Sequence, residues 1–563
     1  MAAMLVCLVL FVMVGGCSSD PEGRSAPPGL TIGTETSLRK LHPESRDFTT
    51  GEMLRLAAAR REAESAQILL LAARPGIRIE SVTASPLTSA AGAEIAAQHI
   101  LVERVGYVTT RKPGYEVEYV GEWPDPRFPF EPFALEPDRL QPLWVTVTVP
   151  PEAEPGQYAG RIALTTGDGD VIQVSIALNV WDFELPLCTR LKTAFGTWYT
   201  RYVAEWYGWN TVPDTYLMKM YDLMFAHRLN PMSQYDRDMW PPVRHLDYCA
   251  EKGLNTISMR ATGTAKPEEF QIVRRNMAEL AARGVVDGAY VCGFDEWPKE
   301  KYPYILETLA AWQKAVPDVN IMAIVPPNDM LAEVVDIWPV CPVHYDPAGV
   351  NYDPEAQRLM QERIAAGDEV WCYIGTSNRP PFANWWIDSA ATEARVAFWQ
   401  AYQHGMTGFL YYATSIWSSN MRAEPKYHFD TMHADQDALA SLAEGKRWPE
   451  VPWNTFTFYN YNGDGQLIYP GPNETPYASI RLANIRDGVE DYEYLAMLAD
   501  LTAQLRARLP GSELIARAEA LLAVNPELAA DWTHFTDSPA VIEAERARVA
   551  ACIVAVKEVL NDE

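Results

Sequence analysis

The 563-residue chain is 48% hydrophobic and too long for one ordinary core, so two or three domains are expected. Its formal net charge of -27, from 74 acidic and 47 basic residues, opposes binding to nucleic acid or to anionic lipid through the protein's own charge. The 18 Trp and 27 Tyr residues are compatible with stacking on sugar rings, although core packing explains most of them.

The first 17 residues form an apolar stretch of the length found in secretory signals, which is too short for a membrane-spanning helix. The stretch ends in Val-Gly-Gly-Cys17, which resembles a bacterial lipobox, and a polar tether over residues 18–30 follows. We therefore expect an exported, lipid-anchored protein of the bacterial cell envelope, modified at Cys17. A plain signal peptide, and hence a secreted or periplasmic protein, is the alternative. No Lys or Arg precedes the apolar run, which leaves the start codon open.

Short β-type runs with turn residues between them fill residues 31–187. The predicted strands cover residues 67–71, 77–82, 142–150, 158–166 and 171–181. The Gly-Asp-Gly-Asp segment at 167–170 joins the last two as a hairpin. Residues 143–149 alternate as a half-buried strand does, with Trp144 on one face and Val145 on the other. This region is expected to be an all-β sandwich domain.

After Pro186, apolar strand candidates alternate with stretches of helical periodicity. The eight predicted strands cover residues 192–198, 229–232, 254–259, 287–294, 320–325, 340–345, 370–374 and 407–412. Helical stretches cover residues 215–227, 268–283, 304–315, 354–366 and 392–404. This pattern predicts a (β/α)8 barrel over residues 188–510, an α/β domain preceded by the β-sandwich. A loop-rich insertion at 413–476 precedes the last barrel helix at 479–505, and a helical segment over 511–563 follows.

The cysteines and histidines show no metal-binding spacing in the sequence. Six scattered cysteines follow Cys17 without a CxxC pair, and six allow 15 pairings, so no disulfide framework can be deduced. Cys292 and Cys372 lie inside apolar strands and are expected to be buried thiols. The nine His residues form no HExxH array, so neither a metal nor another cofactor is expected.

Residues 289–297, Ala-Tyr-Val-Cys-Gly-Phe-Asp-Glu-Trp, form an apolar strand that ends in two adjacent carboxylates, Asp295 and Glu296. Because the carboxyl end of a barrel strand faces the catalytic mouth, this position favours a catalytic site. The alternative is structural, since adjacent acids also start helices and a helical stretch follows from residue 299. Strict alternation would turn the two side chains to opposite faces, so the pair functions only where the strand breaks into its loop.

Two longer motifs lie downstream: residues 462–471, Asn-Gly-Asp-Gly-Gln-Leu-Ile-Tyr-Pro-Gly, and residues 479–495, which begin Ser-Ile-Arg-Leu-Ala-Asn. Shorter motifs in the sandwich region are residues 61–67, 123–126 and 180–183. Together with the acid pair, these motifs resemble glycoside hydrolase family 123, the exo-β-N-acetylgalactosaminidases and their relatives of unassigned function. The resemblance covers residues 31–510. One departure is Trp297, because the family's acid pair is typically followed by Pro.

The resemblance implies an enzyme in which Asp295 orients the substrate's 2-acetamido group and Glu296 is the acid/base. In this substrate-assisted mechanism the acetamido oxygen attacks the anomeric carbon, so no protein nucleophile is needed. The implied activity is that of an exo-acting glycoside hydrolase that releases terminal β-linked N-acetylhexosamine, N-acetylgalactosamine first, with retention of configuration. A glycan or glycoconjugate would be the substrate, and the lipid at Cys17 would be the contact with the membrane.

Aromatic residues at or near the ends of the first, sixth, seventh and eighth predicted strands are candidates for a sugar subsite: Trp198, Tyr345, Tyr373 and Trp417. Asp346 either binds a sugar hydroxyl or caps the turn at Pro347. The charged run over residues 486–493 is expected to be structural, because Arg486 and Glu490 have i,i+4 spacing on a helix.

Two other functions stay open at the level of sequence. The first is a glycosidase for a sugar without an acetamido group, with Glu296 as acid and Asp346 or another strand-end carboxylate as nucleophile or base. The second is a non-catalytic carbohydrate-binding surface lipoprotein that keeps only the fold. Activity on substrates with and without the 2-acetamido group distinguishes these functions.

Overall fold

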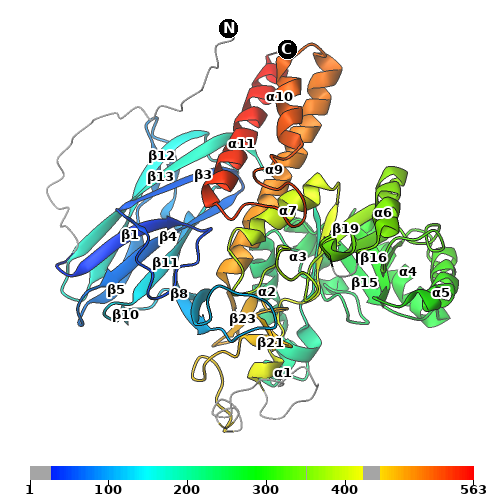
Figure 1. Ribbon diagram of the computed structural model, residues 1–563, viewed down its shortest axis with the longest axis horizontal. Coiled ribbons are helices and arrows are strands. Elements are labelled where there is room, and N and C mark those ends of the chain that lie inside the picture. Colours follow the sequence, from blue (N-terminus) through cyan, green and yellow to red (C-terminus); the bar gives the residue numbers. More distant parts are fainter. Residues whose placement is uncertain (1–26, 350–351, 422–439, 441–443, 563) are drawn as a thin grey trace.

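The computed structural model describes residues 27–349, 352–421, 440 and 444–562. Figure 1 shows a β-sandwich, a barrel of parallel strands and helices beside it, and long helices at the carboxyl end that rise above both. The predicted signal sequence, Cys17 and most of the tether lie outside the described residues, as does part of the 413–476 insertion. Within the described residues, no helix is long and apolar enough to cross a membrane.

Two sheets pack face to face in the first domain, which confirms the predicted sandwich. One sheet has the order β2-β1-β4-β11-β8-β9; the other has the order β10-β5-β12-β13-β3, with β6 paired to β12 and β7 to β6. The strands are β1 (Leu30–Thr36), β2 (Thr49–Thr50), β3 (Met53–Arg60), β4 (Ala63–Ala72), β5 (Arg78–Ala84), β6 (Leu87–Ser89), β7 (Glu94–Ile95), β8 (Ile100–Thr109), β9 (Glu122–Pro129), β10 (Phe133–Ala134), β11 (Leu140–Thr148), β12 (Gly156–Thr166) and β13 (Val171–Glu184). The predicted hairpin joins β12 to β13. Side chains such as Ile68, Val145 and Leu164 fill the space between the sheets.

Strand β11 is buried on both faces, although its sequence alternates as a half-buried strand does. Val145 and Val147 face the sandwich core. On the opposite face Trp144 is fully buried and packs with Ile480 and Ala483 of a later helix. The expectation of an exposed face on this strand is therefore wrong, because that helix covers it.

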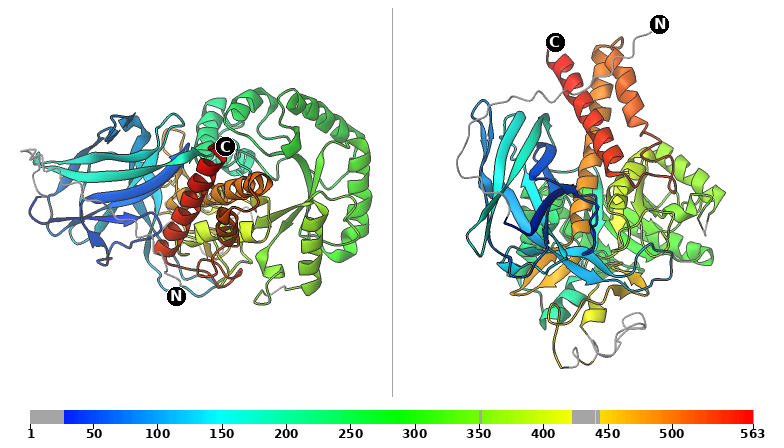
Figure 2. Two further views of the ribbon diagram at one scale, coloured as in Figure 1. Left: turned by 90° about the horizontal axis from the view of Figure 1, so that it is seen from above. Right: turned by 60° about the vertical axis from the view of Figure 1, so that its left-hand side comes forward.

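Seven parallel strands form the barrel sheet in the order β14-β20-β19-β18-β17-β16-β15. They are β14 (Lys192–Phe195), β15 (Ile257–Ala261), β16 (Ala289–Asp295), β17 (Asn320–Ile324), β18 (Ile337–Val340), β19 (Glu369–Tyr373) and β20 (Gly408–Tyr411). The barrel helices are α1 (Ala204–Tyr207), α2 (Asp214–Ala226), α3 (Leu246–Glu251), α4 (Pro267–Ala281), α5 (Tyr302–Ala315), α6 (Pro354–Ala366) and α7 (Glu393–Gln403). The order is that of a (β/α)8 barrel, and Figure 2 shows the helices outside the strands.

The second predicted strand, residues 229–232, does not form as a regular strand. This segment makes one parallel bridge, between Met232 and Gly196 of the first barrel strand's loop. The Asn230 side chain replaces the other ladder bonds, because it donates to the carbonyl of Thr193 at 3.0 Å and accepts from the Asn255 N–H at 3.1 Å. The barrel is therefore closed at this position by a side chain rather than by a continuous ladder.

The sixth predicted strand was placed too late in the chain. Residues 340–345 were predicted, whereas β18 ends at Val340 and a short 3-10 turn (Pro342–His344) follows. The barrel interior is filled by side chains such as Tyr290, Met322 and Trp371, so it is a packed core.

The long helix α9 (Ile480–Arg508) lies between the sandwich and the barrel, and residues 480–495 are all buried. Arg481 makes two hydrogen bonds of 2.8 Å to Asp125 of β9. Asp491 receives two from Arg395 of α7, at 2.8 and 2.6 Å. Arg486 lies 3.7 Å from Glu490, so the predicted i,i+4 pair forms. The charged motif therefore holds the domains together and does not line the barrel mouth.

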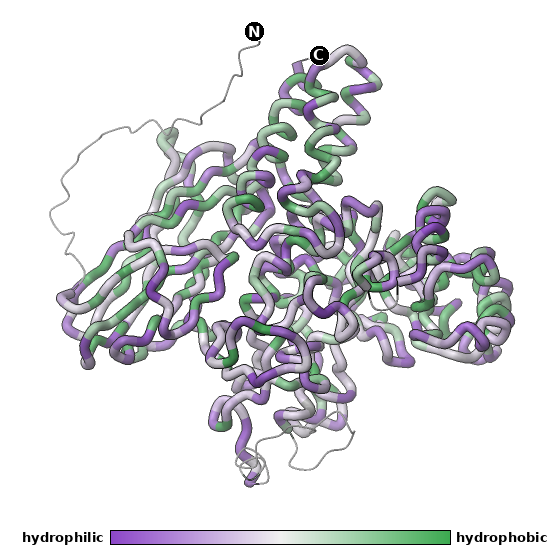
Figure 3. Tube along the Cα trace, in the orientation of Figure 1, coloured by the Kyte–Doolittle hydropathy of each residue, from purple (hydrophilic) through white to green (hydrophobic). Residues whose placement is uncertain are grey.

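Smaller elements complete the chain. Two hairpins lie between the barrel and α9, formed by β21 (Phe456–Phe458) with β22 (Tyr461–Asn462) and by β23 (Ile468–Gly471) with β24 (Thr475–Ala478). Helices α10 (Glu513–Leu522) and α11 (Pro539–Asn561) pack on α9, and Figure 3 shows hydrophobic and hydrophilic residues alternating along them. All six described cysteines are free thiols; Cys292 and Cys372 are buried, as predicted.

The Arg481–Asp125 pair gives a stability prediction. Arg481→Met leaves the Asp125 carboxylate buried without its partner, so the free energy of unfolding should fall by roughly 3 to 5 kcal/mol. Arg244→Met breaks an exposed pair with Asp214 and should cost at most about 1 kcal/mol. Denaturant unfolding of both variants measures the difference. Equal small losses would show that the buried pair does not hold the two domains.

Candidate active site

The carboxyl end of β16 is distorted by a close approach of its neighbour. The pairing of β16 with β17 shifts register between Cys292 and Asp295. Between them, a Cβ atom on Gly293 would lie 2.0 Å from the carbonyl oxygen of Thr262, so only glycine fits there. Such irregularities re-aim the side chains that follow, and they are frequent next to active sites.

Glu296 has a backbone conformation that breaks the strand alternation. Its φ is 55°, in the left-handed region that non-glycine residues rarely adopt, and its N–H donates to the carbonyl of Ile324 at 2.8 Å. Both Asp295 and Glu296 are exposed at the barrel mouth. The strand therefore breaks into its loop at the acid pair, as a shared site for the two carboxylates requires.

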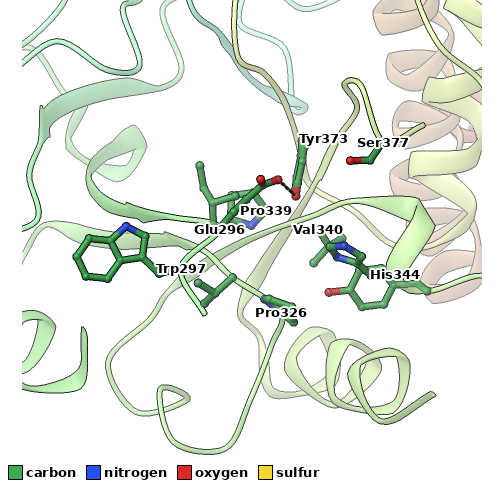
Figure 4. Close-up of a pocket in the computed structure, with 11 residues that line it drawn as sticks. Glu296, Trp297, Pro326, Pro339, Val340, His344, Tyr373 and Ser377 are labelled. Carbon is green, nitrogen blue, oxygen red and sulfur yellow. Dashed lines mark hydrogen bonds between the residues drawn. The ribbon is translucent and has the colours of Figure 1, made fainter. Parts of the chain in front are cut away.

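A cavity of about 260 Å³ opens beside Glu296. Its walls come from the ends of β16, β17, β18 and β19 and are formed by Glu296, Trp297, Ile324, Val325, Pro326, Pro339, Val340, His344, Tyr345, Tyr373 and Ser377. The Tyr373 hydroxyl donates a hydrogen bond of 2.9 Å to Oε1 of Glu296 (Figure 4). This bond points the carboxylate toward β19 and orients it over the cavity.

The pKa of Asp295 is raised to about 6. Desolvation by the surrounding protein is the larger cause, and the charge of Glu296 adds to it. A hydrogen bond from the Tyr235 hydroxyl acts in the opposite direction, because it stabilises the ionised carboxylate. Asp295 thus titrates close to neutrality, within the range in which acid and base catalysts operate.

The predicted aromatic residues divide into three groups. Tyr373 and Tyr345 line the cavity; the Tyr345 hydroxyl is itself buried and has no hydrogen-bond partner among the described residues. Trp198 lies outside the cavity lining, with its ring 5.5 Å from that of Tyr235 and its Nε1 bonded to the Tyr412 carbonyl. Trp417 was wrongly predicted to wall a subsite, because it has no exposed surface and its Nε1 donates to the carbonyl of Ile468 at 2.8 Å.

Asp346 is buried and does not line the cavity. Its Oδ1 accepts a hydrogen bond of 2.8 Å from the N–H of Ala348, which caps the turn at Pro347. Of the two roles predicted for this residue, the structure thus contains the turn cap. A role in binding sugar stays a prediction.

Three residues near the acid pair were missed in the sequence. Tyr235 follows the irregular second segment, which carries no strand signal after residue 232. His344 and Ser377 line the cavity from the turn after β18 and the loop after β19. Misplacing the sixth strand hid His344, since a residue inside a strand is not expected to line a mouth. The described residues contain no group of three His, Cys, Asp or Glu side chains that could hold a metal ion.

Two sequence models of one family match the chain. The model described as Glycoside hydrolase 123, catalytic domain, matches residues 270–498, and that of the Glycoside hydrolase 123 N-terminal domain matches residues 33–166. The first includes the acid pair and the buried part of α9. The second includes most of the sandwich.

A solved structure is similar over almost the whole chain. It is a family 123 glycoside hydrolase from Clostridium perfringens, with a TM-score of 0.63 and 13% identity, over 94% of this chain and 99% of that one. A family 39 glycoside hydrolase from Bacteroides cellulosilyticus has 12% identity over 72% of this chain and 79% of that one, but its TM-score of 0.27 supports no argument. No curated protein matches the chain.

Proposed function

The chain belongs to glycoside hydrolase family 123 and is a glycoside hydrolase, and we propose that it releases terminal β-linked N-acetylhexosamine by a substrate-assisted, retaining mechanism. N-acetylgalactosamine is our first choice of sugar. The observation that carries the mechanism is the lining of the cavity: among its described residues, Glu296 is the one carboxylate. A carboxylate nucleophile facing Glu296 across the cavity is thus absent from that lining. Asp295 lies outside the lining too, but it is exposed next to Glu296 in the chain, and we propose that it holds the acetamido group from there.

Each carboxylate has a separate role in this proposal. Glu296 donates a proton to the leaving oxygen and then removes one from the attacking water. Asp295 accepts the acetamido N–H and stabilises the positive charge of the oxazolinium that forms when the amide oxygen attacks the anomeric carbon. Tyr373 holds Glu296 in place for the proton transfer, since its hydroxyl already contacts Oε1.

The mechanism needs a proton on Glu296 and a charge on Asp295, whereas burial and the charge of Glu296 raise the pKa of Asp295 to about 6 in the free protein. Substrate binding lowers the pKa of Asp295 again and so keeps its carboxylate charged. An amide N–H donated to Asp295 stabilises its ionised form, as the Tyr235 hydroxyl already does. Asp295 is then the charged carboxylate of the pair, which leaves the role of the acid to Glu296.

Asp346, the one partner named for the competing two-carboxylate mechanism, does not reach the cavity. Asp346 is buried, bonds the Ala348 N–H and lies outside the cavity lining. Membership of a hydrolase family likewise disfavours a purely carbohydrate-binding role. The acetamido-dependent activity therefore has the better support.

We further propose a glycan or glycoconjugate substrate and a place in the bacterial cell envelope. The Clostridium perfringens relative acts in glycolipid glycan hydrolysis, which favours the same substrate class here. The Val-Gly-Gly-Cys17 motif favours export and lipidation. Two lipid signals give stable anchoring, so the catalytic domain would act at the membrane surface.

Substrate preference tests the proposed function. The protein should hydrolyse aryl 2-acetamido-2-deoxy-β-galactosides and leave the matching 2-hydroxy galactosides intact, because a substrate without the amide cannot form the oxazolinium. Release of the aryl alcohol measures both rates. Equal hydrolysis of the two substrates would refute the assisted mechanism.

Substitutions of Glu296 and Asp295 should lower kcat in different ways. Glu296→Gln should lose about 100-fold or more in kcat on substrates with poor leaving groups and much less on activated aryl glycosides, which need little protonation to depart. Asp295→Asn should lose about 100- to 1000-fold on both, because it impairs formation of the oxazolinium. Glu300→Gln, at an exposed acid in the next turn, is the matched control and should retain full activity. A uniform loss for Glu296→Gln would exclude it as the acid.

The pH profile tests the environment of Asp295. Below about pH 6 this carboxyl gains a proton, so kcat/KM should fall as the pH decreases through that value. Tyr235→Phe removes a hydrogen bond that lowers the pKa of Asp295, so the acid limb should move to higher pH. Tyr248→Phe removes a comparable hydroxyl–carboxylate bond to Asp222, away from the cavity, and should leave the profile unchanged. If Tyr235→Phe leaves the acid limb unchanged, that limb reports the titration of a group other than Asp295.

A further inference from the structure

The wall of the cavity that faces Glu296 carries one imidazole, that of His344. The backbone of this residue is fixed on both sides: its N–H donates to the Cys341 carbonyl at 3.0 Å, and its carbonyl accepts from the Asp353 N–H at 2.9 Å. The Tyr345 ring lies beside the imidazole, with the centroids 6.2 Å apart. Figure 4 shows His344 and Trp297 on opposite sides of Glu296. The side chain is therefore presented to the cavity from a rigid turn.

The imidazole itself is unused by the protein. Neither ring nitrogen of His344 bonds to any residue in the described part of the chain, and neither is sealed from solvent. Burial lowers the pKa of His344, so near neutral pH the ring is uncharged, with one N–H donor and one acceptor nitrogen. A sugar hydroxyl also donates and accepts, and it therefore matches this ring better than a charged group would.

The geometry of catalysis decides which part of the sugar reaches His344. The leaving oxygen must lie within hydrogen-bond reach of Glu296. Apolar side chains, including Pro326 and Val340, line the same cavity as Glu296 and His344. A ring that is seated with its anomeric carbon at Glu296 hence extends its far side, with the hydroxyls at C3, C4 and C6, toward the opposite wall.

We infer that His344 hydrogen-bonds a hydroxyl on the far side of the terminal sugar and so determines which sugar the enzyme accepts. The inference rests on the proposed function for the orientation of the sugar. Galacto and gluco sugars differ only at C4, so a bond to the C4 hydroxyl would make His344 the residue that separates them. Recognition by a fixed hydrogen bond discriminates more strongly than an apolar pocket does.

The test compares His344→Phe with the wild type on aryl β-glycosides of N-acetylgalactosamine and of its 3-, 4- and 6-deoxy analogues. The variant should lower kcat/KM by about three- to tenfold on the complete sugar, as expected for one neutral hydrogen bond. On the analogue that lacks the bonded hydroxyl, the same substitution should have no effect. His344→Gln keeps a donor and an acceptor and should recover most of the loss. His534→Phe, at an exposed imidazole far from the cavity in sequence, is the matched control.

An equal loss on every analogue, or no loss on any, would overturn the inference. The proposed function can fail separately. If the wild type hydrolyses none of the aryl glycosides but binds the methyl β-glycosides of the same sugars, dissociation constants measured by calorimetry replace kcat/KM in the comparison and still decide the role of His344. A wild type that binds none of these sugars overturns both.

Discussion

The burial of charged side chains along α9 is the constraint on which the rest of the structure depends. Arg481 has 1% of its side chain exposed and its partner Asp125 has none, so each charge is stable only while the other stays in place. Because Asp125 belongs to the sandwich and α9 packs against the barrel helix α7, this pair and the Arg395–Asp491 pair fix the two domains to one another. These two buried ion pairs therefore hold the barrel, and with it the mouth, in a fixed position relative to the sandwich.

Chemistry at the mouth depends on a second, local constraint. Gly293 lets the Thr262 backbone approach, the strand loses its register, and Glu296 takes a left-handed conformation. As a result, Asp295 and Glu296 both lie at the barrel mouth, although their surroundings differ. The Asp295 carboxyl is accessible at the mouth but partly desolvated and bonded by Tyr235, whereas Glu296 is held over the cavity by Tyr373. Two carboxyls in separate environments can divide the work of one reaction.

Much of this was predictable from sequence, for identifiable reasons. Regular periodicity located most strands and helices, and i,i+4 spacing marked Arg486 and Glu490 as a structural pair. The prediction of a regular second barrel strand was wrong because the Asn230 side chain replaces ladder bonds, and this replacement leaves no periodic signal in the sequence. The prediction that Trp417 lines a sugar subsite was wrong because an aromatic residue near a strand end is equally suited to the core, where Trp417 lies. Which residues face the cavity depends on turns after the strands, and for this reason His344 was missed.

The central claim is that Asp295 organises the substrate's own amide as the nucleophile. The most direct test is a crystal structure with the N-acetylgalactosamine-derived thiazoline, a stable mimic of the bicyclic oxazolinium. The thiazoline should lie in the cavity beside Glu296, with its ring nitrogen within hydrogen-bond distance of an Asp295 oxygen. A thiazoline bound with its ring nitrogen away from Asp295 would contradict this role.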